Sequence, residues 1–152
     1  HVTVGKVTDK GIKDANNMGA AMAPAAHEAI SAYFKDTGTT PRDYDLILTG
    51  DLGKLGHAIT KELFARDGID MGDTYQDCGL LLYDLQKQDM HAGASGCGCS
   101  ASVLNGYLLT ELRQKKWKRI LFGALLSPIS SFQGESIPGI CHVVCISATK
   151  EG

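Results

Sequence analysis

A run of small residues at positions 91–101, HAGASGCGCSA, constrains the fold of this chain more than any other stretch. Every residue in it after His91 is Gly, Ala, Ser or Cys, so the backbone can pass very close to another backbone or to a ligand. An apolar segment of helical character, residues 103–112, follows it. A loop that becomes a helix in this way directs free N–H groups toward whatever lies in front of it. The run therefore predicts either a site for an anion or a polarised carbonyl, or a helix packed tightly on a sheet.

Segments with the patterns of strands and helices alternate along the chain, and this order predicts an α/β sheet with right-handed crossovers. We place the start of the first helix at Pro24, because proline inside a helix costs about 3 kcal/mol but is tolerated at its first position. Residues 18–23 are then expected to form a loop. The expected strands are 2–8, 44–49, 119–122 and 140–147, with a strand or pocket wall at 78–85; the expected helices are 24–35, 55–64 and 99–114, and 127–136 is a polar loop.

Length and charge limit the class of protein. A chain of 152 residues is predicted to form one domain, residues 1–152, and at this size it buries roughly two-thirds of its unfolded surface. A net charge of −2 does not favour nucleic acid as a partner. No segment reaches the roughly 18 apolar residues of a membrane span, so we expect no transmembrane segment. The sequence begins at His1 within a strand-like pattern, and we expect it to be a piece of a longer protein.

One basic cluster stands out in this balanced composition. It lies between the end of the third helix and the strand at 119–122. Cations at a helix C-terminus are stabilised by the helix dipole, and this accounts for the cluster without a partner. Its members are Arg113, Lys115, Lys116, Lys118 and Arg119.

The cysteines occur in an odd number and at core-like or Gly-rich positions, which predicts reduced thiols rather than a disulfide framework. Cys97 and Cys99 are too close together for an ordinary zinc half-site, so we expect no metal site. A thiol at a helix N-terminus has a lowered pKa and can act as a nucleophile, with His91 or His142 as its base. The alternative is that the thiols are small buried hydrophobes. The five cysteines are Cys78, Cys97, Cys99, Cys141 and Cys145.

Asp51 lies where function is expected in such a fold. It directly follows the predicted buried strand 44–49, and ligands of open α/β sheets bind beyond the carboxyl ends of the strands. The segment 50–54 is not a phosphate loop, because its spacing is wrong and no Ser or Thr follows Lys54. His27 and His57 fall within predicted helices; the sequence names no partner for them, and we expect them at the surface.

Several motifs resemble the C-terminal half of the thiolase superfamily. Met18-Gly19 before Met22-Ala23-Pro24-Ala25 resembles the start of the first helix of that half, and His91 with Gly93-Ala94-Ser95-Gly96 resembles its Gly-His-Pro…Gly-Ala-Ser-Gly loop. Within the superfamily, the chain is most similar to a branch that acts in spore-forming bacteria. The phrases MGAAMAPAA, DYDLILTGDLGKLG, DCGLLLYD, HAGASGCGCSA, GALLSP and GESIPGICHVV carry that similarity over essentially the whole chain.

The resemblance implies a thiolase-like βαβαβαββ half with a mixed sheet and helices on both faces. In the full protein such a half pairs with a similar N-terminal half in a five-layered body. It also implies binding of dipicolinic acid and support for its uptake, as the calcium complex, into the developing spore. The implied location is the spore or forespore, peripheral to the inner membrane, with other proteins of the same membrane system as partners.

The departures from the thiolase pattern imply that this chain is not an enzyme. Thiolases have His or Asn where this chain has Gly50-Asp51, and Met90 occupies the position of their His, which is displaced here to His91. Cys141 lacks the Cys-x-Gly-Gly-Gly surroundings of the catalytic cysteine, and the nucleophile of the family belongs to the N-terminal half. The segment 119–124 also looks shorter than the corresponding strand of the family, as if residues between Phe122 and Gly123 were missing.

Our leading hypothesis is therefore a binding protein without cofactor, in which this half forms one wall of a pocket for a small aromatic dicarboxylate. N–H donors at the helix start, a hydrogen bond from His91 and an oxygen of Asp51 near calcium suit such a ligand. The expected binding residues are Asp51, His91, Ser95, Gly96, Cys97, Cys99 and His142.

Two other hypotheses stay open. One is a thioester-dependent acyl-transfer enzyme with Cys97, Cys99 or Cys141 as its acid–base cysteine. The other is a structural domain that docks proteins of the spore membrane. A half-body leaves an apolar surface uncovered, so we also expect a homodimer.

Overall fold

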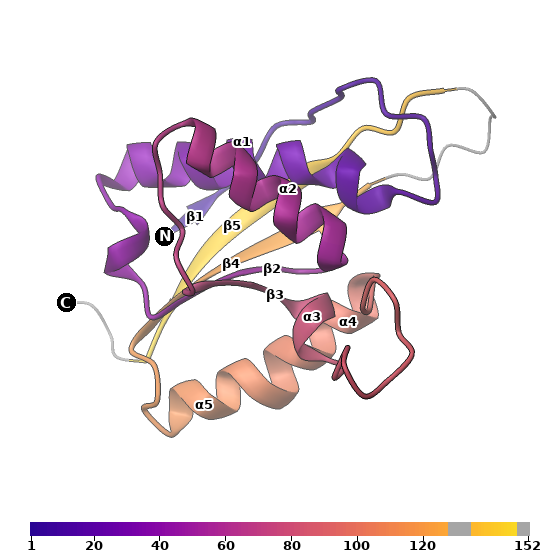
Figure 1. The fold of residues 1–152 in the computed structure, drawn as a ribbon. Helices are drawn as coiled ribbons and strands as arrows, with labels where there is room; N and C mark the ends of the chain where they lie inside the picture. Colours follow the sequence, from indigo (N-terminus) through magenta and orange to yellow (C-terminus); the bar gives the residue numbers. More distant parts are fainter. Residues whose placement is uncertain (128–134, 149–152) are drawn as a thin grey trace.

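A five-stranded mixed sheet forms the centre of the molecule in the computed structural model, which describes residues 1–127 and 135–148. The strand order is β1-β5-β4-β2-β3 (Figure 1). β2 is parallel to both β3 and β4, whereas β5 is antiparallel to β4 and to β1. The strands are β1 (Val2–Thr3), β2 (Leu46–Thr49), β3 (Tyr75–Asp77), β4 (Arg119–Leu126) and β5 (Ile140–Ser147).

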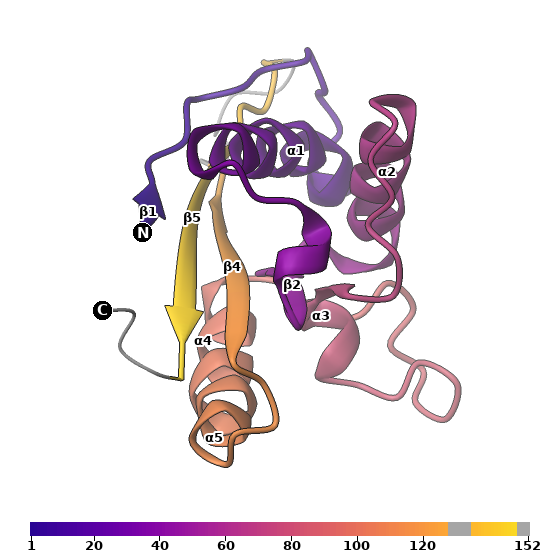
Figure 2. The ribbon, with the colours of Figure 1, turned by 90° about the vertical axis from the view of Figure 1, so that its left-hand side faces the viewer.

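Helices cover both faces of this sheet, so the predicted α/β class with a mixed sheet is confirmed. The long helices α1 and α2 pack on one face, and α4 and α5 lie across the other (Figures 1 and 2). A π-helical turn, η2, joins α4 to α5. The helices are α1 (Met18–Thr37), the 3-10 turn η1 (Pro41–Asp43), α2 (Gly53–Arg66), α3 (Cys78–Leu81), α4 (Cys97–Val103), η2 (Leu104–Leu108) and α5 (Leu109–Arg113).

Two apolar cores follow from the alternation of side chains along the strands. In β2, Ile47 points into the core beneath α1 and α2, while Leu46 and Leu48 point into the core beneath α4 and α5. All four residues of this strand are buried, because a parallel strand between two layers of helices has no solvent face. The position of β2 between two neighbouring strands and two layers of helices therefore explains why its sequence is a continuous buried run.

The predicted start of the first helix at Pro24 is wrong, since α1 begins at Met18 and contains Pro24. The side chain of Asn17 accepts a hydrogen bond from the N–H of Ala20 at 3.2 Å and caps the helix. The first turns then bury Met22 and Ala23 against the rest of the fold. Burial and capping outweigh the missing hydrogen bond at the proline, which sequence spacing did not show.

Other boundaries also differ from the predictions. The third strand is β3, just before residue 78, and the apolar run at 78–85 begins with α3 instead. β4 extends to Leu126 and pairs with β5 in unbroken register, so the strand is longer than the expected 119–122. The first strand has only two residues, and the third helix begins at Cys97. Most of the expected loop at 127–136 lies outside the described residues.

The close crossing of α1 and α2 depends on two glycines. A Cβ atom on Gly56 would lie 2.9 Å from the Cα and carbonyl oxygen of Gly19 and 2.8 Å from the Cβ of Leu52. We expect Gly56→Ala to lower the free energy of unfolding by about 1–3 kcal/mol, because backbone atoms must move apart. Denaturant unfolding measures this loss.

Gly106→Ala is the matched control, because no atom lies within 4 Å of a Cβ at this helical position. For this variant we expect the free energy of unfolding to rise by up to about 1 kcal/mol, because alanine has a higher helix propensity than glycine. Equal effects of the two substitutions would contradict the account of the helix crossing.

Candidate functional site

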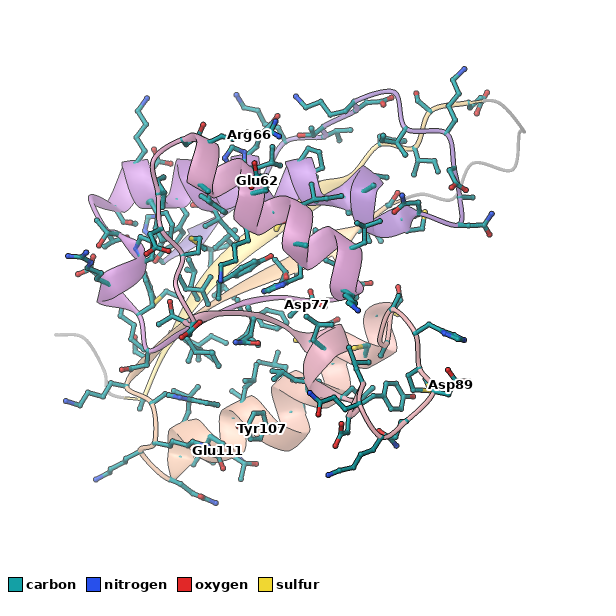
Figure 3. All side chains as sticks on the ribbon, in the orientation of Figure 1. Glu62, Arg66, Asp77, Asp89, Tyr107 and Glu111 are labelled. Atoms are coloured by element: carbon teal, nitrogen blue, oxygen red, sulfur yellow. The ribbon has the colours of Figure 1, made fainter. Side chains whose placement is uncertain are left out.

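The candidate site lies at the carboxyl ends of the parallel strands, where open α/β sheets bind ligands. Asp51 follows β2, Asp77 ends β3, and α4 begins nearby at Cys97. Figure 3 labels Asp77 at this end of the sheet, beside α3. Two carboxylates from neighbouring strands are therefore brought to one edge.

Asp77 is the most highly connected side chain of this region, and sequence reasoning missed it. Its Oδ2 accepts hydrogen bonds from Thr49 Oγ1 at 2.6 Å and from the N–H of Leu52 at 2.9 Å. Its Oδ1 accepts from the N–H groups of Gly53 and Gly79, both at 2.9 Å. Burial raises the pKa of Asp77, and these four hydrogen bonds act against that rise. The carboxylate thus joins the end of β2 to the starts of α2 and α3.

Asp51 is only 9% exposed, and only one of its two carboxylate oxygens has a hydrogen-bond partner among the described residues. Its Oδ2 accepts the N–H of Gly96 at 2.9 Å, while its buried Oδ1 has no hydrogen-bond partner within residues 1–127 and 135–148. Burial raises the pKa of Asp51, the N–H of Gly96 lowers it, and the negative charge of Asp77 raises it further. The prediction that Asp51 follows a buried strand is confirmed, and its hydrogen bond to Gly96 places it beside the small-residue run.

The charges of these carboxylates act on three thiols. Burial raises the pKa of Cys99 to about 11 and that of Cys141 to about 12, and the charge of Asp51 adds to both shifts. Burial and the charge of Asp77 also raise the pKa of Cys78. These thiols stay protonated at neutral pH. All five cysteines are free, as the sequence predicted, and the exposed Cys97 is the one at the start of α4.

The small-residue run allows the close backbone approach that the sequence predicted. The N–H of Lys54 donates to the carbonyl of Ala92 at 2.8 Å, and the N–H of Ala94 donates to the carbonyl of Gly79 at 2.9 Å. A Cβ on Gly93, whose φ is 94°, would lie 2.5 Å from the same Gly79 oxygen. The loop is therefore bound to the starts of α2 and α3, and Ser95 and Gly96 are left exposed to solvent.

The contacts of the two histidines of the predicted site are with residues other than Asp51. The side chain of His91 is 86% exposed, with Nδ1 3.5 Å from Asp89, and it borders a hollow of about 460 Å³ with Lys54 and Leu55. His142 is exposed on β5, where its Nδ1 accepts the N–H of Gly5 at 3.2 Å. In the described part of the chain, neither histidine is hydrogen-bonded or ion-paired to Asp51.

His27 and His57 are half-buried rather than at the surface, and each has a partner that the sequence did not reveal. His27 Nε2 lies 2.8 Å from Asp67, and its ring packs edge-on against Phe64. The ring of His57 stacks on Tyr75 with the centroids 4.5 Å apart. Both contacts are tertiary, and helical spacing alone does not reveal them.

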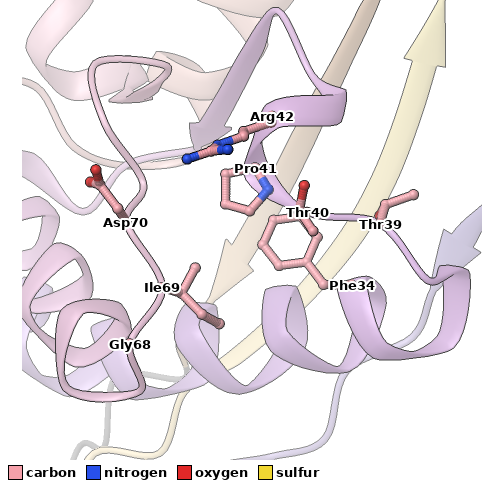
Figure 4. Close-up of a pocket in the computed structure, with 8 residues that line it drawn as sticks. All are labelled: Phe34, Thr39, Thr40, Pro41, Arg42, Gly68, Ile69 and Asp70. Atoms are coloured by element: carbon pink, nitrogen blue, oxygen red, sulfur yellow. The ribbon is translucent and has the colours of Figure 1, made fainter.

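A second hollow, of about 420 Å³, lies between the end of α1, η1 and the loop after α2 (Figure 4). It contains none of the predicted site residues. Across the described residues, no three His, Cys, Asp or Glu side chains are grouped so that they could hold a metal ion. The hollow is lined by Phe34, Thr39, Thr40, Pro41, Arg42, Gly68, Ile69 and Asp70.

Similarity to known proteins covers nearly the whole chain. The family model of stage V sporulation protein AD (SpoVAD) matches residues 1–147. The stage V sporulation protein AD of Bacillus subtilis (strain 168) is 49% identical over 145 residues, which are 93% of this chain and 43% of that protein. Two solved structures of human mitochondrial 3-ketoacyl-CoA thiolase, one in complex with CoA, are similar at 20% identity with TM-scores of 0.35 and 0.36; they match 93% of this chain and 29% of theirs. The chain thus spans less than half the length of the curated relative.

We expect the stability difference between Asp51→Asn and the wild type to depend on pH. A carboxyl group whose pKa is raised on folding holds its proton more tightly in the folded state, so its ionisation lowers the free energy of unfolding as pH rises. As the pH rises above the ordinary aspartate pKa of 3.8, the wild type should therefore lose stability relative to Asp51→Asn. Urea unfolding over a series of pH values measures this difference.

Asp36→Asn, the same substitution at an exposed aspartate in the last turn of α1, is the control, and the change with pH for Asp51→Asn should exceed the change for this variant. A difference for Asp51→Asn that stays constant with pH, or that shifts in favour of the wild type, would contradict the burial of this carboxyl group.

Proposed function

The chain belongs to the stage V sporulation protein AD family, and we propose that it binds dipicolinic acid and supports its uptake, as the calcium complex, into the developing spore. Membership makes it a sporulation protein. The ligand and the step in uptake are the proposal, because the chain spans 43% of its curated relative. The site beside Asp51 is the one we assign to the ligand.

The buried Oδ1 of Asp51 is the observation that carries this proposal. A buried carboxylate oxygen without a hydrogen-bond partner is costly unless a cation or a donor approaches it. Calcium binds roughly six to eight oxygen ligands in a flexible geometry, and carboxylate oxygens are among its usual ligands. Dipicolinate chelates calcium through its two carboxylates and ring nitrogen and leaves coordination positions open. Asp51 is suited to supply one oxygen to such a complex.

The start of α4 supports the same ligand from the other side. Gly96 is the N-cap residue of α4. Because glycine has no side chain, it cannot cap the first N–H groups of the helix. Free N–H groups at a helix start are good partners for a carboxylate. In this proposal Ser95, Gly96 and Cys97 contact the organic part of the ligand, whereas His91 and His142 remain at the rim.

The state of the thiols supports binding without catalysis. Cys99 and Cys141 have raised pKa values, about 11 and about 12, so little thiolate is present at neutral pH. A nucleophilic cysteine needs a lowered pKa and a nearby base. We therefore propose that this chain is not an enzyme and that it needs no cofactor.

We propose that the protein works at the spore inner membrane as a peripheral partner of other proteins, as a dimer, and as one half of a longer two-half body. In the part of the chain that the structure describes, no helix has both the length and the apolar character to cross a membrane. Attachment through another protein or through a surface fits this proposal.

Calorimetric titration of dipicolinate, with and without calcium, tests the proposed function. We expect binding that requires calcium, and we expect Asp51→Asn to weaken it at least about tenfold, because the variant loses a charged oxygen ligand. The titration is run on this chain and on a longer form that includes the remainder of the family's length.

Asp36→Asn is the matched control, with the same change of charge at an exposed position, and should bind like the wild type. Binding by the longer form alone would place this chain as one wall of a shared pocket. No binding to either form, or equal binding by Asp51→Asn, would refute the proposal.

A further inference from the structure

The turn between α5 and β4 carries a dense group of cations that the proposed ligand site does not use. Five of the 15 Lys and Arg residues of the chain fall within residues 113–119, which we call the basic turn. The chain as a whole has a net charge of −2, so the rest of it is acidic on balance. Arg113, Lys115, Lys116 and Lys118 are all exposed. The positive charge is thus concentrated at one place on the surface.

Neighbouring acids offset this charge only in part. Lys116 is paired with Glu111 at 2.5 Å. Within residues 1–127 and 135–148, Arg113, Lys115 and Lys118 form no ion pair. The carboxylate of Asp45 accepts hydrogen bonds from the backbone N–H groups of Lys118 and Arg119, at 2.7 and 2.9 Å. Several cations therefore remain available to a partner.

The backbone at Lys115 indicates that the helix end alone does not explain the group. Lys115 has a φ of 61°, a left-handed conformation in which glycine is the preferred residue at the end of a helix. The helix dipole favours cations beside the last turn, but Lys118 and Arg119 lie beyond it, at the start of β4. A cation thus occupies a position where glycine is more favourable for the backbone.

Two aromatic side chains form part of the same surface. Trp117 is half-buried against the core beneath α4 and α5, and its ring packs edge-on against Tyr107 with centroids 5.5 Å apart. Lys116 Nζ lies 5.1 Å from the Trp117 ring and 5.5 Å from the Tyr107 ring. Tryptophan and tyrosine flanked by lysine and arginine are typical of the interface between membrane and water.

We propose that the basic turn, together with Trp117 and Tyr107, binds the surface of a bilayer that contains anionic phospholipids. Clustered cations attract the negative surface of such a bilayer, and the aromatic rings suit the depth of the headgroups. Nucleic acid fits less well, because Lys116 lies over both rings and hinders the stacking of bases on them. This inference does not depend on the proposed binding of dipicolinate.

The position of the turn gives the contact a direction. Arg119 begins β4, whereas Asp51 follows the end of the parallel strand β2, so the basic turn and the candidate site lie at opposite ends of the sheet (Figure 1). A bilayer bound at the turn leaves the exposed residues beside Asp51, Ser95 and Gly96, open to the solution. Binding to lipid and binding of a small ligand can then occur together.

Sedimentation with vesicles and tryptophan fluorescence test this inference. Trp117 is the single tryptophan of the chain, so its emission reports this surface directly. We expect a blue shift and co-sedimentation with vesicles of phosphatidylcholine mixed with phosphatidylglycerol, and neither with phosphatidylcholine alone. Both effects should weaken at high salt, because surface electrostatics are screened.

A double substitution tests the charges. Lys115→Gln with Lys118→Gln should lower partitioning onto the mixed vesicles roughly 25-fold, because each cation near such a surface contributes about fivefold. Lys6→Gln with Lys13→Gln, at exposed lysines near the N-terminus, makes the same change in net charge and should have little effect.

Three results would overturn the inference. The first is an unchanged Trp117 emission with the mixed vesicles, which needs no variant and therefore no assumption about folding. The second is an equal loss of partitioning in the two double variants. The third is binding of duplex DNA as tight as that of the mixed vesicles at the same salt concentration.

Discussion

The buried carboxylate of Asp77 joins more parts of the site than any other interaction. It receives four hydrogen bonds, from a side chain at the end of β2 and from backbone N–H groups at the starts of α2 and α3. A buried charge is tolerated only when donors of this kind surround it. Because the small-residue loop is in turn bound to Lys54 and Gly79, the position of the loop depends indirectly on the same carboxylate.

The proposed binding role follows from a contrast between the two buried aspartates. Asp77 uses both oxygens for structure, whereas Asp51 uses one and leaves the other without a partner among the described residues. A second negative charge so close to the first is unfavourable, and a cation that approaches Asp51 would relieve it. A calcium-bound form of the ligand, whose metal ion can approach Asp51, is therefore a better candidate for this site than a free dianion.

Some of this architecture is visible in the sequence and some is not. The buried run of β2, the helical spacing of α2 and the last strand predicted the α/β class, and the rule of strand ends predicted the place of Asp51. The helix start predicted at Pro24 was wrong, because capping by Asn17 and burial of the first turns outweigh the low helix propensity of proline. Asp77 escaped notice because a single aspartate in a three-residue strand has no pattern, although an aspartate before Cys78-Gly79 is a typical helix cap. His91 and His142 were grouped with Asp51 from sequence position, but the distance between them depends on tertiary geometry.

Amide hydrogen exchange in Asp77→Asn tests most directly whether this carboxylate organises the site. Asparagine keeps one accepting oxygen, so either the amide of Leu52, which donates to Oδ2, or the amides of Gly53 and Gly79, which donate to Oδ1, lose their acceptor. The account predicts that the amides without an acceptor exchange at least about tenfold faster. The amide of Gly96 should follow, while amides in the centre of β5, such as that of Val143, should keep the protection of the wild type. Two results would contradict the central place given to Asp77. One is unchanged exchange at the amides of Leu52, Gly53, Gly79 and Gly96, and the other is an equal increase in exchange throughout the sheet.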